Sequence, residues 1–328
     1  MIQVGLFITK NKDKYLYFKK KLTNLLSDNN KIQFVFLPNK NSVKKYISTL
    51  NILLTYNIEE DFFNLRSDTL KWIHIGNAGV DNCLIDEVLK SKVIISNSRG
   101  INSVPVSEYV MSTILYFSKQ FQDCIIFKKS KKWTQWEIAK KNNILENKFV
   151  GIIGYGAIGK EIAKKSKAFN MKVIAIRRLQ KKIEKNKFVD ELMPMNKLNY
   201  LLAKSDFVII ACPLTPLTRH MINKANLKLI RKTSYLINIS RGEVINENDL
   251  IRSLKTKKIK GAALDVFSKE PLHNNSLFFN LDNVFISPHI SGNFKGYQES
   301  VIDSFADNLN RYLSNKPLKN RVCKKRMY

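Results

Sequence analysis

Residues 149–159 read Phe-Val-Gly-Ile-Ile-Gly-Tyr-Gly-Ala-Ile-Gly and contain the motif GxGxxG at Gly154, Gly156 and Gly159. An apolar run typical of a buried strand precedes the motif, and a run of helix-forming residues follows it. The first glycine permits a tight turn, the second lets the backbone approach a pyrophosphate, and the third lets helix and strand pack closely. Free N–H groups at the start of the helix bind phosphate readily. The stretch therefore predicts a strand–turn–helix unit of the Rossmann type, which binds a dinucleotide.

The second strand of this unit, residues 171–176, is followed directly by Arg177 and Arg178. NAD-binding units usually carry an acidic residue here, which binds the ribose hydroxyls. An arginine can instead pair with the 2′-phosphate of NADP through charge-assisted bonds. We therefore predict that NADP is preferred over NAD. The two arginines also have a plainer interpretation, as part of the general surface of a very basic protein.

Apolar runs after the motif alternate with helix-forming stretches and predict a doubly wound parallel sheet. They are KVIAI at 172–176, FVIIAC at 207–212, YLINIS at 235–240, GAALDVF at 261–267 and NVFIS at 283–287. Before the motif, shorter apolar runs alternate with polar stretches and predict a smaller parallel α/β sheet. These runs are QVGLFI at 3–8, IQFVFL at 32–37, ILLT at 52–55, WIHIG at 72–76 and VIISN at 93–97. An apolar-periodic segment at 106–121 predicts a long helix that joins the two domains.

The composition indicates a globular protein with a formal net charge of +29. Because lysine and arginine occur along the whole chain, without aromatic residues interleaved in the basic clusters, we expect no nucleic-acid partner. No apolar run approaches the roughly 18 residues needed to span a bilayer, so we expect no membrane partner. The four cysteines form no CxxC or Cys/His pair, which argues against a metal site and a disulfide framework. A reducing cytoplasm fits these features.

Charged side chains follow three of the predicted strands. Arg241 follows the strand at 235–240, Asp265 and Glu270 stand at and just past the next, and His289 follows the strand at 283–287. Because the carboxyl ends of parallel strands meet at one edge of a sheet, we expect these side chains to share a crevice. Hydride transfer to a keto acid needs a cation for the carboxylate, a proton donor for the carbonyl oxygen and an acid to hold that donor. The remaining histidines are interpreted as structural or merely exposed: His74, His220 and His273.

At these residues the chain resembles the D-isomer-specific 2-hydroxyacid dehydrogenases, a family that includes glyoxylate and hydroxypyruvate reductases, over nearly its full length. The resemblance rests on NAGVD at 77–81, SNSRG at 96–100, VSEY at 106–109, the glycine motif, PLT at 213–215, SRG at 240–242, LDVF at 264–267, EPL at 270–272 and SPH at 287–289. It implies an α/β protein with two doubly wound parallel-sheet domains. A Rossmann dinucleotide-binding domain, residues 102–291, is inserted in a flavodoxin-like substrate domain, residues 1–101 with 292–328. It also implies a homodimer built largely through the helix after Val106.

The resemblance further implies roles for single residues. Arg241 would bind the carboxylate and carbonyl of a small 2-keto acid, His289 would donate the proton during reduction, and Glu270 would hydrogen-bond His289. The backbone of Ala78, Gly79 and Val80 would hold the substrate carboxylate. The cofactor residues would be Asp265 at the nicotinamide carboxamide, Ala157 and Ile158 at the pyrophosphate, and Cys212, Pro213 and Ile239 along the cofactor path.

Two other functions remain compatible with this scaffold. One is a dinucleotide-sensing binding protein, like the C-terminal binding protein corepressors. The other is an oxidoreductase of the same fold that acts on phosphite or formate. The intact set of Arg241, Glu270 and His289 favours a keto-acid reductase over the first, and Glu270 argues against a formate enzyme, in which an amide stands beside the histidine.

Overall fold

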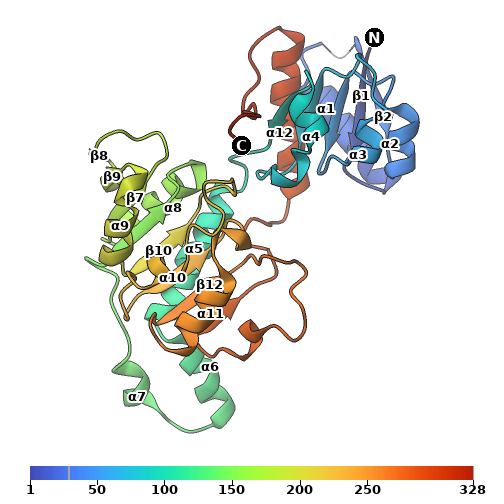
Figure 1. Cartoon of the computed structure of the whole chain (residues 1–328). Helices are drawn as coiled ribbons and strands as arrows, with labels where there is room; N and C mark the ends of the chain where they lie inside the picture. The colour runs from blue at the N-terminus through green and yellow to red at the C-terminus, as the bar shows by residue number, and fades with distance from the viewer. Residues whose placement is uncertain (29, 328) are drawn as a thin grey trace. The chain divides into compact units, whose positions relative to one another are not determined.

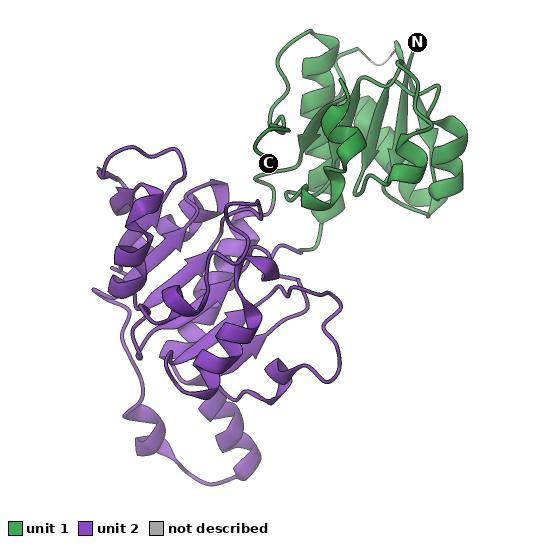
Figure 2. Cartoon of the chain, in the orientation of Figure 1, with its two compact units in different colours: residues 1–101, 294–328 green, residues 102–293 purple. Residues whose placement is uncertain are grey.

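The computed structural model describes residues 1–28 and 30–327. The chain folds as two compact units, coloured separately in Figure 2: unit 1 comprises Met1–Ile101 and Phe294–Tyr328, and unit 2 comprises Asn102–Asn293. Unit 2 is thus inserted into the sequence of unit 1. Within the described residues no helix is both long enough and apolar enough to cross a membrane.

Unit 1 is built on a parallel five-stranded sheet, whose order β2-β1-β3-β4-β5 is that of flavodoxin-like folds. The strands are β1 (Ile2–Phe7), β2 (Ile32–Phe36), β3 (Ile52–Thr55), β4 (Trp72–Ile75) and β5 (Ile94–Asn97). The helices are α1 (Lys12–Leu25), α2 (Lys40–Tyr46), α3 (Glu60–Phe63), the short η1 (Asp81–Cys83), α4 (Asp86–Lys90) and α12 (Tyr297–Leu313). All five strands were predicted from their apolar runs, and those runs are nearly continuous because helices cover both faces of the sheet.

His74 lies in the core of unit 1, on β4. It is fully buried, and its two ring nitrogens contact the hydroxyls of Ser96 and Ser98 at 2.8 and 3.0 Å. Burial lowers the pKa of His74 to about 3, so the ring stays neutral. The interpretation of His74 as a structural residue is confirmed.

Unit 2 is built on an eight-stranded sheet of order β13-β12-β11-β10-β6-β7-β9-β8. Figure 1 labels β7, β8, β9, β10 and β12 of this sheet. Its strands are β6 (Phe149–Ile153), β7 (Lys172–Ile176), β8 (Glu184–Asn186), β9 (Val189–Met193), β10 (Phe207–Ile210), β11 (Tyr235–Asn238), β12 (Gly261–Leu264) and β13 (Val284–Ile286). The run β9-β7-β6-β10-β11-β12 reproduces the Rossmann order 3-2-1-4-5-6. The predicted fold class, a Rossmann unit inserted in the sequence of a flavodoxin-like unit, is confirmed.

The helices of unit 2 cover both faces of its sheet. They are α5 (Ser103–Ser118), α6 (Phe121–Ser130), α7 (Gln135–Ala139), α8 (Ala157–Ala168), α9 (Leu198–Lys204), α10 (Lys224–Leu227) and α11 (Glu247–Lys255), with the short η2 (Met195–Lys197), η3 (Gly242–Val244) and η4 (Leu277–Asn280). The helix predicted at 106–121 as a connection between domains is α5. It ends at Ser118 and belongs to unit 2, where it packs against α8.

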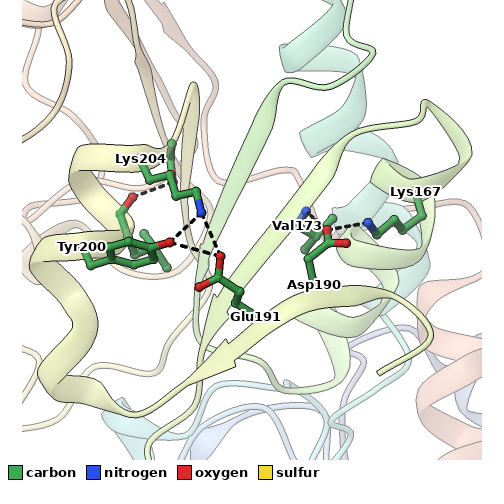
Figure 3. Close-up of polar contacts among 8 residues, drawn as sticks. Lys167, Val173, Asp190, Glu191, Tyr200 and Lys204 are labelled. Atoms are coloured by element: carbon green, nitrogen blue, oxygen red, sulfur yellow. Dashed lines mark hydrogen bonds and ion pairs between the residues drawn. The ribbon is translucent and has the colours of Figure 1, made fainter. Parts of the chain in front are cut away.

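The strands β8 and β9 were not predicted, and β8 pairs with β9 in the antiparallel sense. Figure 3 shows how β9 is fastened to the rest of the unit. Asp190 Oδ2 accepts hydrogen bonds from Lys167 Nζ of α8 at 2.5 Å and from Val173 N of β7 at 2.7 Å. Beside it, Glu191 Oε1 accepts a hydrogen bond from Lys204 Nζ of α9 at 2.8 Å. The edge of the sheet next to Arg177 is therefore held by ion pairs from two helices.

Candidate active site

The glycine-rich turn joins β6 to α8 and has the geometry that a dinucleotide needs. Gly154 has φ of +109°, a conformation that favours glycine, and a Cβ there would lie 2.7 Å from the backbone of Cys212. A Cβ on Gly159 would lie 2.3 Å from the carbonyl oxygen of Gly154. Among the described residues, by contrast, a Cβ on Gly156 would meet nothing within 4 Å, and no side chain caps α8. The open backbone at the start of α8 fits a pyrophosphate.

The other predicted cofactor residues also lie at the carboxyl ends of strands in unit 2. Cys212 and Pro213 follow β10, and Ile239 follows β11 with its N–H donating to Ile210 O at 3.3 Å. Burial raises the pKa of the Cys212 thiol to about 12, so this group packs as an apolar side chain and is no nucleophile. Ala157 and Ile158 are the first two residues of α8.

Arg177 and Arg178 are exposed and directly follow β7. The backbone N–H of Arg177 donates to Met193 O at 3.0 Å, which ties the end of β7 to β9. Tyr155, in the glycine-rich turn, lies close enough to Arg177 for the arginine to favour its phenolate, although burial raises the pKa of Tyr155 more. Arg177 therefore lies near the turn, at the strand end where a Rossmann unit holds the adenosine ribose, and Arg178 is the next residue along the chain.

His289 and Glu270 form a hydrogen-bonded pair. The distance from His289 Nδ1 to Glu270 Oε2 is 2.7 Å, and Glu270 Oε1 accepts a hydrogen bond from Phe267 N at 2.9 Å. The carboxylate is thus held on both oxygens. The side chain of His289 remains 47% exposed, and its Nε2 makes no hydrogen bond to the part of the chain that the structure describes. A ring held at Nδ1 with Nε2 open is suited to pass a proton to a ligand.

Backbone hydrogen bonds connect the three strand ends that carry the predicted set. Asp265 N donates to Asn238 O at 3.1 Å, which joins the ends of β12 and β11, and Ser287 N donates to Leu264 O at 3.0 Å, which joins β13 to β12. A Cβ on Gly242 would lie only 1.9 Å from the carbonyl carbon of Phe267. The loop that carries Arg241 is therefore in close contact with the loop that carries Glu270.

Arg241 is half-buried directly after the β11 strand end. Its Nη1 donates to Ser240 O at 2.8 Å, and its carbonyl oxygen accepts from Asn238 Nδ2 at 2.9 Å. These bonds fix the backbone on both sides of the guanidinium. A fixed guanidinium is well suited to pair with a planar carboxylate.

Asp265 is fully buried and holds the loop that carries His289. Its Oδ1 accepts from Ile290 N at 2.8 Å and from Ser287 Oγ at 2.6 Å, and its Oδ2 accepts from Ser291 N at 2.9 Å. The sequence suggested a cofactor role for Asp265 and gave no sign of this loop-holding one. Its neighbour Ser287 was noted only as part of the SPH motif.

Ala78, Gly79 and Val80 lie in unit 1, in the loop that follows β4. The carbonyl oxygens before and within this loop are occupied: Gly76 O accepts from Tyr297 Oη at 3.0 Å, and Ala78 O accepts from Asn97 Nδ2 at 2.6 Å. The N–H groups of Ala78, Gly79 and Val80 donate no backbone hydrogen bond among the described residues. Such a loop offers donors to an anion.

The fold and these sites define a dinucleotide-dependent oxidoreductase, and comparison with known proteins gives its family. The model of the D-isomer specific 2-hydroxyacid dehydrogenase NAD binding domain matches residues 111–291. A glyoxylate reductase of Pyrococcus horikoshii is 34% identical over 270 residues, which cover 81% of this chain and 79% of the relative. The chain belongs to the D-isomer specific 2-hydroxyacid dehydrogenase family. It is therefore an NAD(P)-dependent oxidoreductase of 2-hydroxy and 2-keto acids.

Solved structures agree with this assignment. A D-isomer specific 2-hydroxyacid dehydrogenase family protein from Aeromonas salmonicida superposes with a TM-score of 0.84 at 26% identity, covering 98% of this chain and 99% of that chain. An NADPH-dependent glyoxylate/hydroxypyruvate reductase from Sinorhizobium meliloti, solved with NADP and sulfate, superposes with a TM-score of 0.85 at 24% identity, covering 100% of both chains. The second likeness shows that the fold is shared over the whole chain.

Proposed function

We propose that this chain reduces a small 2-keto acid to the D-2-hydroxy acid, with Arg241, Glu270 and His289 as its catalytic residues. The observation that carries the proposal is the His289–Glu270 pair, held at 2.7 Å at a strand end of the nucleotide-binding sheet. Unit 2 would hold the cofactor along the glycine-rich turn, Cys212, Pro213 and Ile239. Unit 1 would supply the backbone N–H groups of Ala78, Gly79 and Val80 to the substrate carboxylate.

The chemistry follows from the atoms that these residues present. A reduced nicotinamide cofactor, held along the glycine-rich turn, would supply the hydride that the carbonyl carbon accepts. His289 gives the proton on Nε2 to the carbonyl oxygen, and Glu270, bonded to Nδ1, keeps the ring oriented and balances the imidazolium charge. Arg241 pairs with the substrate carboxylate and stabilises negative charge that develops on the carbonyl oxygen. In the oxidation direction His289 takes the proton back.

The substrate is best sought among the smallest 2-keto acids, because relatives of this chain are glyoxylate reductases and one structural neighbour is a glyoxylate/hydroxypyruvate reductase. We propose glyoxylate or hydroxypyruvate. A panel of 2-keto acids of increasing side-chain length, assayed with NADH and with NADPH, tests this. Catalytic efficiency should be highest for one of these two acids. A clear optimum at a large, branched or aromatic keto acid would contradict the proposal.

We propose that NADPH is preferred over NADH. Arg177 and Arg178 occupy the position at which NAD-binding units carry an acidic residue, and such an acid would repel the 2′-phosphate of NADPH. A charge-assisted hydrogen bond is worth about 1.5–3 kcal/mol. At about 1.4 kcal/mol per decade, the preference should be about 10- to 100-fold in catalytic efficiency. It should weaken at high salt, because both side chains are exposed.

The variant Arg177→Asp should remove or reverse this cofactor preference, since it places a carboxylate at the ribose. Catalytic efficiencies with NADPH and NADH, measured at low and high salt, give the result. The control variant Lys232→Asp makes the same charge change. Lys232 lies before the amino end of β11, whereas Arg177 lies at the carboxyl end of β7, so the preference should not change. Equal efficiencies in the parent protein would show that the arginines belong to the general basic surface.

The helices α6 and α7 have no buried residue, although they carry large apolar side chains. The exposed fractions are 55% for Ile126 and 51% for Ile125 on α6, 68% for Trp136 on α7, and 79% for Trp133 in the segment between the two helices. Exposure of such apolar side chains to water is unfavourable in free energy, and an exposed apolar patch is typical of an interface. Because homodimers are the commonest soluble oligomers, we propose that a second copy of this chain covers the patch together with the preceding helix α5, through which the resemblance implies the dimer. The protein has four free cysteines, which fit the reducing cytoplasm that we propose as its compartment.

Sedimentation equilibrium should give twice the chain mass of 38.0 kDa at micromolar concentration. The double variant Ile126→Asp/Trp136→Asp should be monomeric, because two carboxylates would be buried without partners. Leu217→Asp, which alters a side chain that is 73% exposed outside the patch, serves as the control and should remain dimeric. A monomeric parent protein, or a dimeric double variant, would contradict the proposed interface.

A further inference from the structure

Two hydroxyl groups, those of the half-buried Tyr109 and the buried Ser287, connect helix α5 to the loop that carries His289. Tyr109 Oη lies 2.5 Å from Ser287 Oγ, and Ser287 Oγ lies 2.6 Å from Asp265 Oδ1. The same carboxylate accepts the backbone N–H groups of Ile290 and Ser291, the two residues after His289. Two hydrogen bonds thus link Tyr109 to the carboxylate of Asp265, which holds the loop that carries His289.

Chemistry decides which group donates and which accepts in the two hydrogen bonds that link Tyr109, Ser287 and Asp265. An ionised carboxylate only accepts, so Ser287 must donate its single hydroxyl proton to Asp265. The proton between Tyr109 and Ser287 therefore comes from Tyr109. Burial raises the pKa of Tyr109 to about 12, so its hydroxyl keeps that proton throughout the neutral range. Tyr109 donates to Ser287, and Ser287 donates to Asp265.

The loop needs this support because His289 has an unfavourable backbone conformation. Its φ is +54°, in the left-handed region, which is unfavourable for an L-residue. The hydrogen bonds of Asp265 to Ile290 and Ser291, together with His289 N donating to Asp265 O at 2.9 Å, hold the backbone there. A rotated Ser287 hydroxyl would leave Asp265 with one donor fewer, and the loop less firmly held.

We propose that Tyr109 and Ser287 are positioning residues for His289, which orient the Asp265 carboxylate that holds the catalytic loop. The inference rests on the proposed role of His289 as proton donor. It assigns to the hydroxyl of Tyr109 a part in keto-acid reduction, although the residue lies in a helix 178 positions before Ser287. Neither hydroxyl is proposed to touch the substrate.

The variant Tyr109→Phe removes the hydroxyl and keeps the ring, which packs against Phe285 with centroids 6.4 Å apart. We expect kcat for keto-acid reduction to fall about 5- to 30-fold, the effect of losing one or two kcal/mol of hydrogen bonding. The dissociation constant of NADPH should change much less than kcat, because the glycine-rich turn is untouched. Ser287→Ala should give a similar loss, and Ser287→Thr, which keeps a hydroxyl, should recover most of it.

Tyr116→Phe is the matched control. Tyr116 lies on the same helix and packs against the same ring of Phe285, with centroids 5.0 Å apart, but its hydroxyl has no hydrogen bond in the part of the chain that the structure describes. Its removal should leave kcat unchanged. If Tyr116→Phe and Tyr109→Phe lowered kcat equally, a general disturbance of this face of α5 and not the hydrogen bond to Ser287 would be responsible, and the proposal would be wrong.

A double-mutant cycle with His289 separates a positioning role from a general structural one. If Tyr109 acts through His289, Tyr109→Phe should cause no further loss of kcat in a His289→Ala background. Independent, multiplicative losses would overturn the inference and leave the role of His289 intact. A His289→Ala enzyme with normal turnover would instead contradict the proposed function itself.

Discussion

Replacement of His289 by alanine is expected to lower kcat for keto-acid reduction by about 10²- to 10⁴-fold, the usual contribution of a positioned general acid. The affinity for NADPH should remain close to that of the parent protein, because His289 lies on the loop after β13 and the glycine-rich turn lies between β6 and α8. Steady-state kinetics and a fluorescence titration with NADPH measure the two effects separately. His220→Ala, at an exposed histidine, should change neither.

Glu270→Gln completes this test of the pair. The amide can still contact Phe267 N and the imidazole, but it no longer offers a negative charge to the protonated ring. Reduction needs that protonated ring, so its rate should begin to fall at a lower pH than in the parent protein. Near-normal turnover of His289→Ala, or an unchanged pH–rate profile of Glu270→Gln, would remove the pair from the mechanism.

The second large effect is expected at Arg241. Arg241→Ala should lower kcat/KM by about 10²- to 10³-fold, because a buried charge pair with the substrate carboxylate is worth several kcal/mol. Arg241→Lys keeps the charge but loses the planar fork, so it should lie between the alanine variant and the parent protein. The measurement is kcat/KM for the best keto acid of the panel.

Arg252→Ala, at an exposed arginine on α11, is the control for Arg241 and should leave kcat/KM unchanged. Thermal unfolding of all three variants should accompany the kinetics, because Arg241 also hydrogen-bonds Ser240 O. If Arg241→Ala changed only the melting temperature and not the kinetics, Arg241 would have to be reassigned as a structural residue.

Much of the fold could be predicted because most strands are buried on both faces and therefore appear as apolar runs in the sequence. The strands β8 and β9 could not, since β8 is an exposed edge strand. The position of β9 depends on ion pairs made by Asp190 and Glu191 with α8 and α9, and the sequence shows these only as scattered charges. The helices α6 and α7 were missed because their apolar residues do not face a core.

The candidate site was predictable as far as it depends on strand ends. The order of the strands brings the ends of β11, β12 and β13 together, so residues that follow them become neighbours. The hydroxyl chain from Tyr109 was not predictable, because it joins residues 178 positions apart and depends on which face of α5 meets the sheet. In the same way, the loop-holding role of Asp265 depends on the left-handed backbone of His289, which no motif reveals.

The most direct test of the central claim is the configuration of the product formed from hydroxypyruvate and NADPH. The account predicts turnover at a rate ordinary for an enzyme, about 1 s⁻¹ or more, and a product that is the D-2-hydroxy acid alone. Chiral chromatography of the reaction mixture gives both the amount and the configuration. An L-product would contradict the proposed placement of His289 and Arg241. Tight binding of NADPH without turnover of any keto acid in the panel would show a dinucleotide-binding protein in place of a reductase.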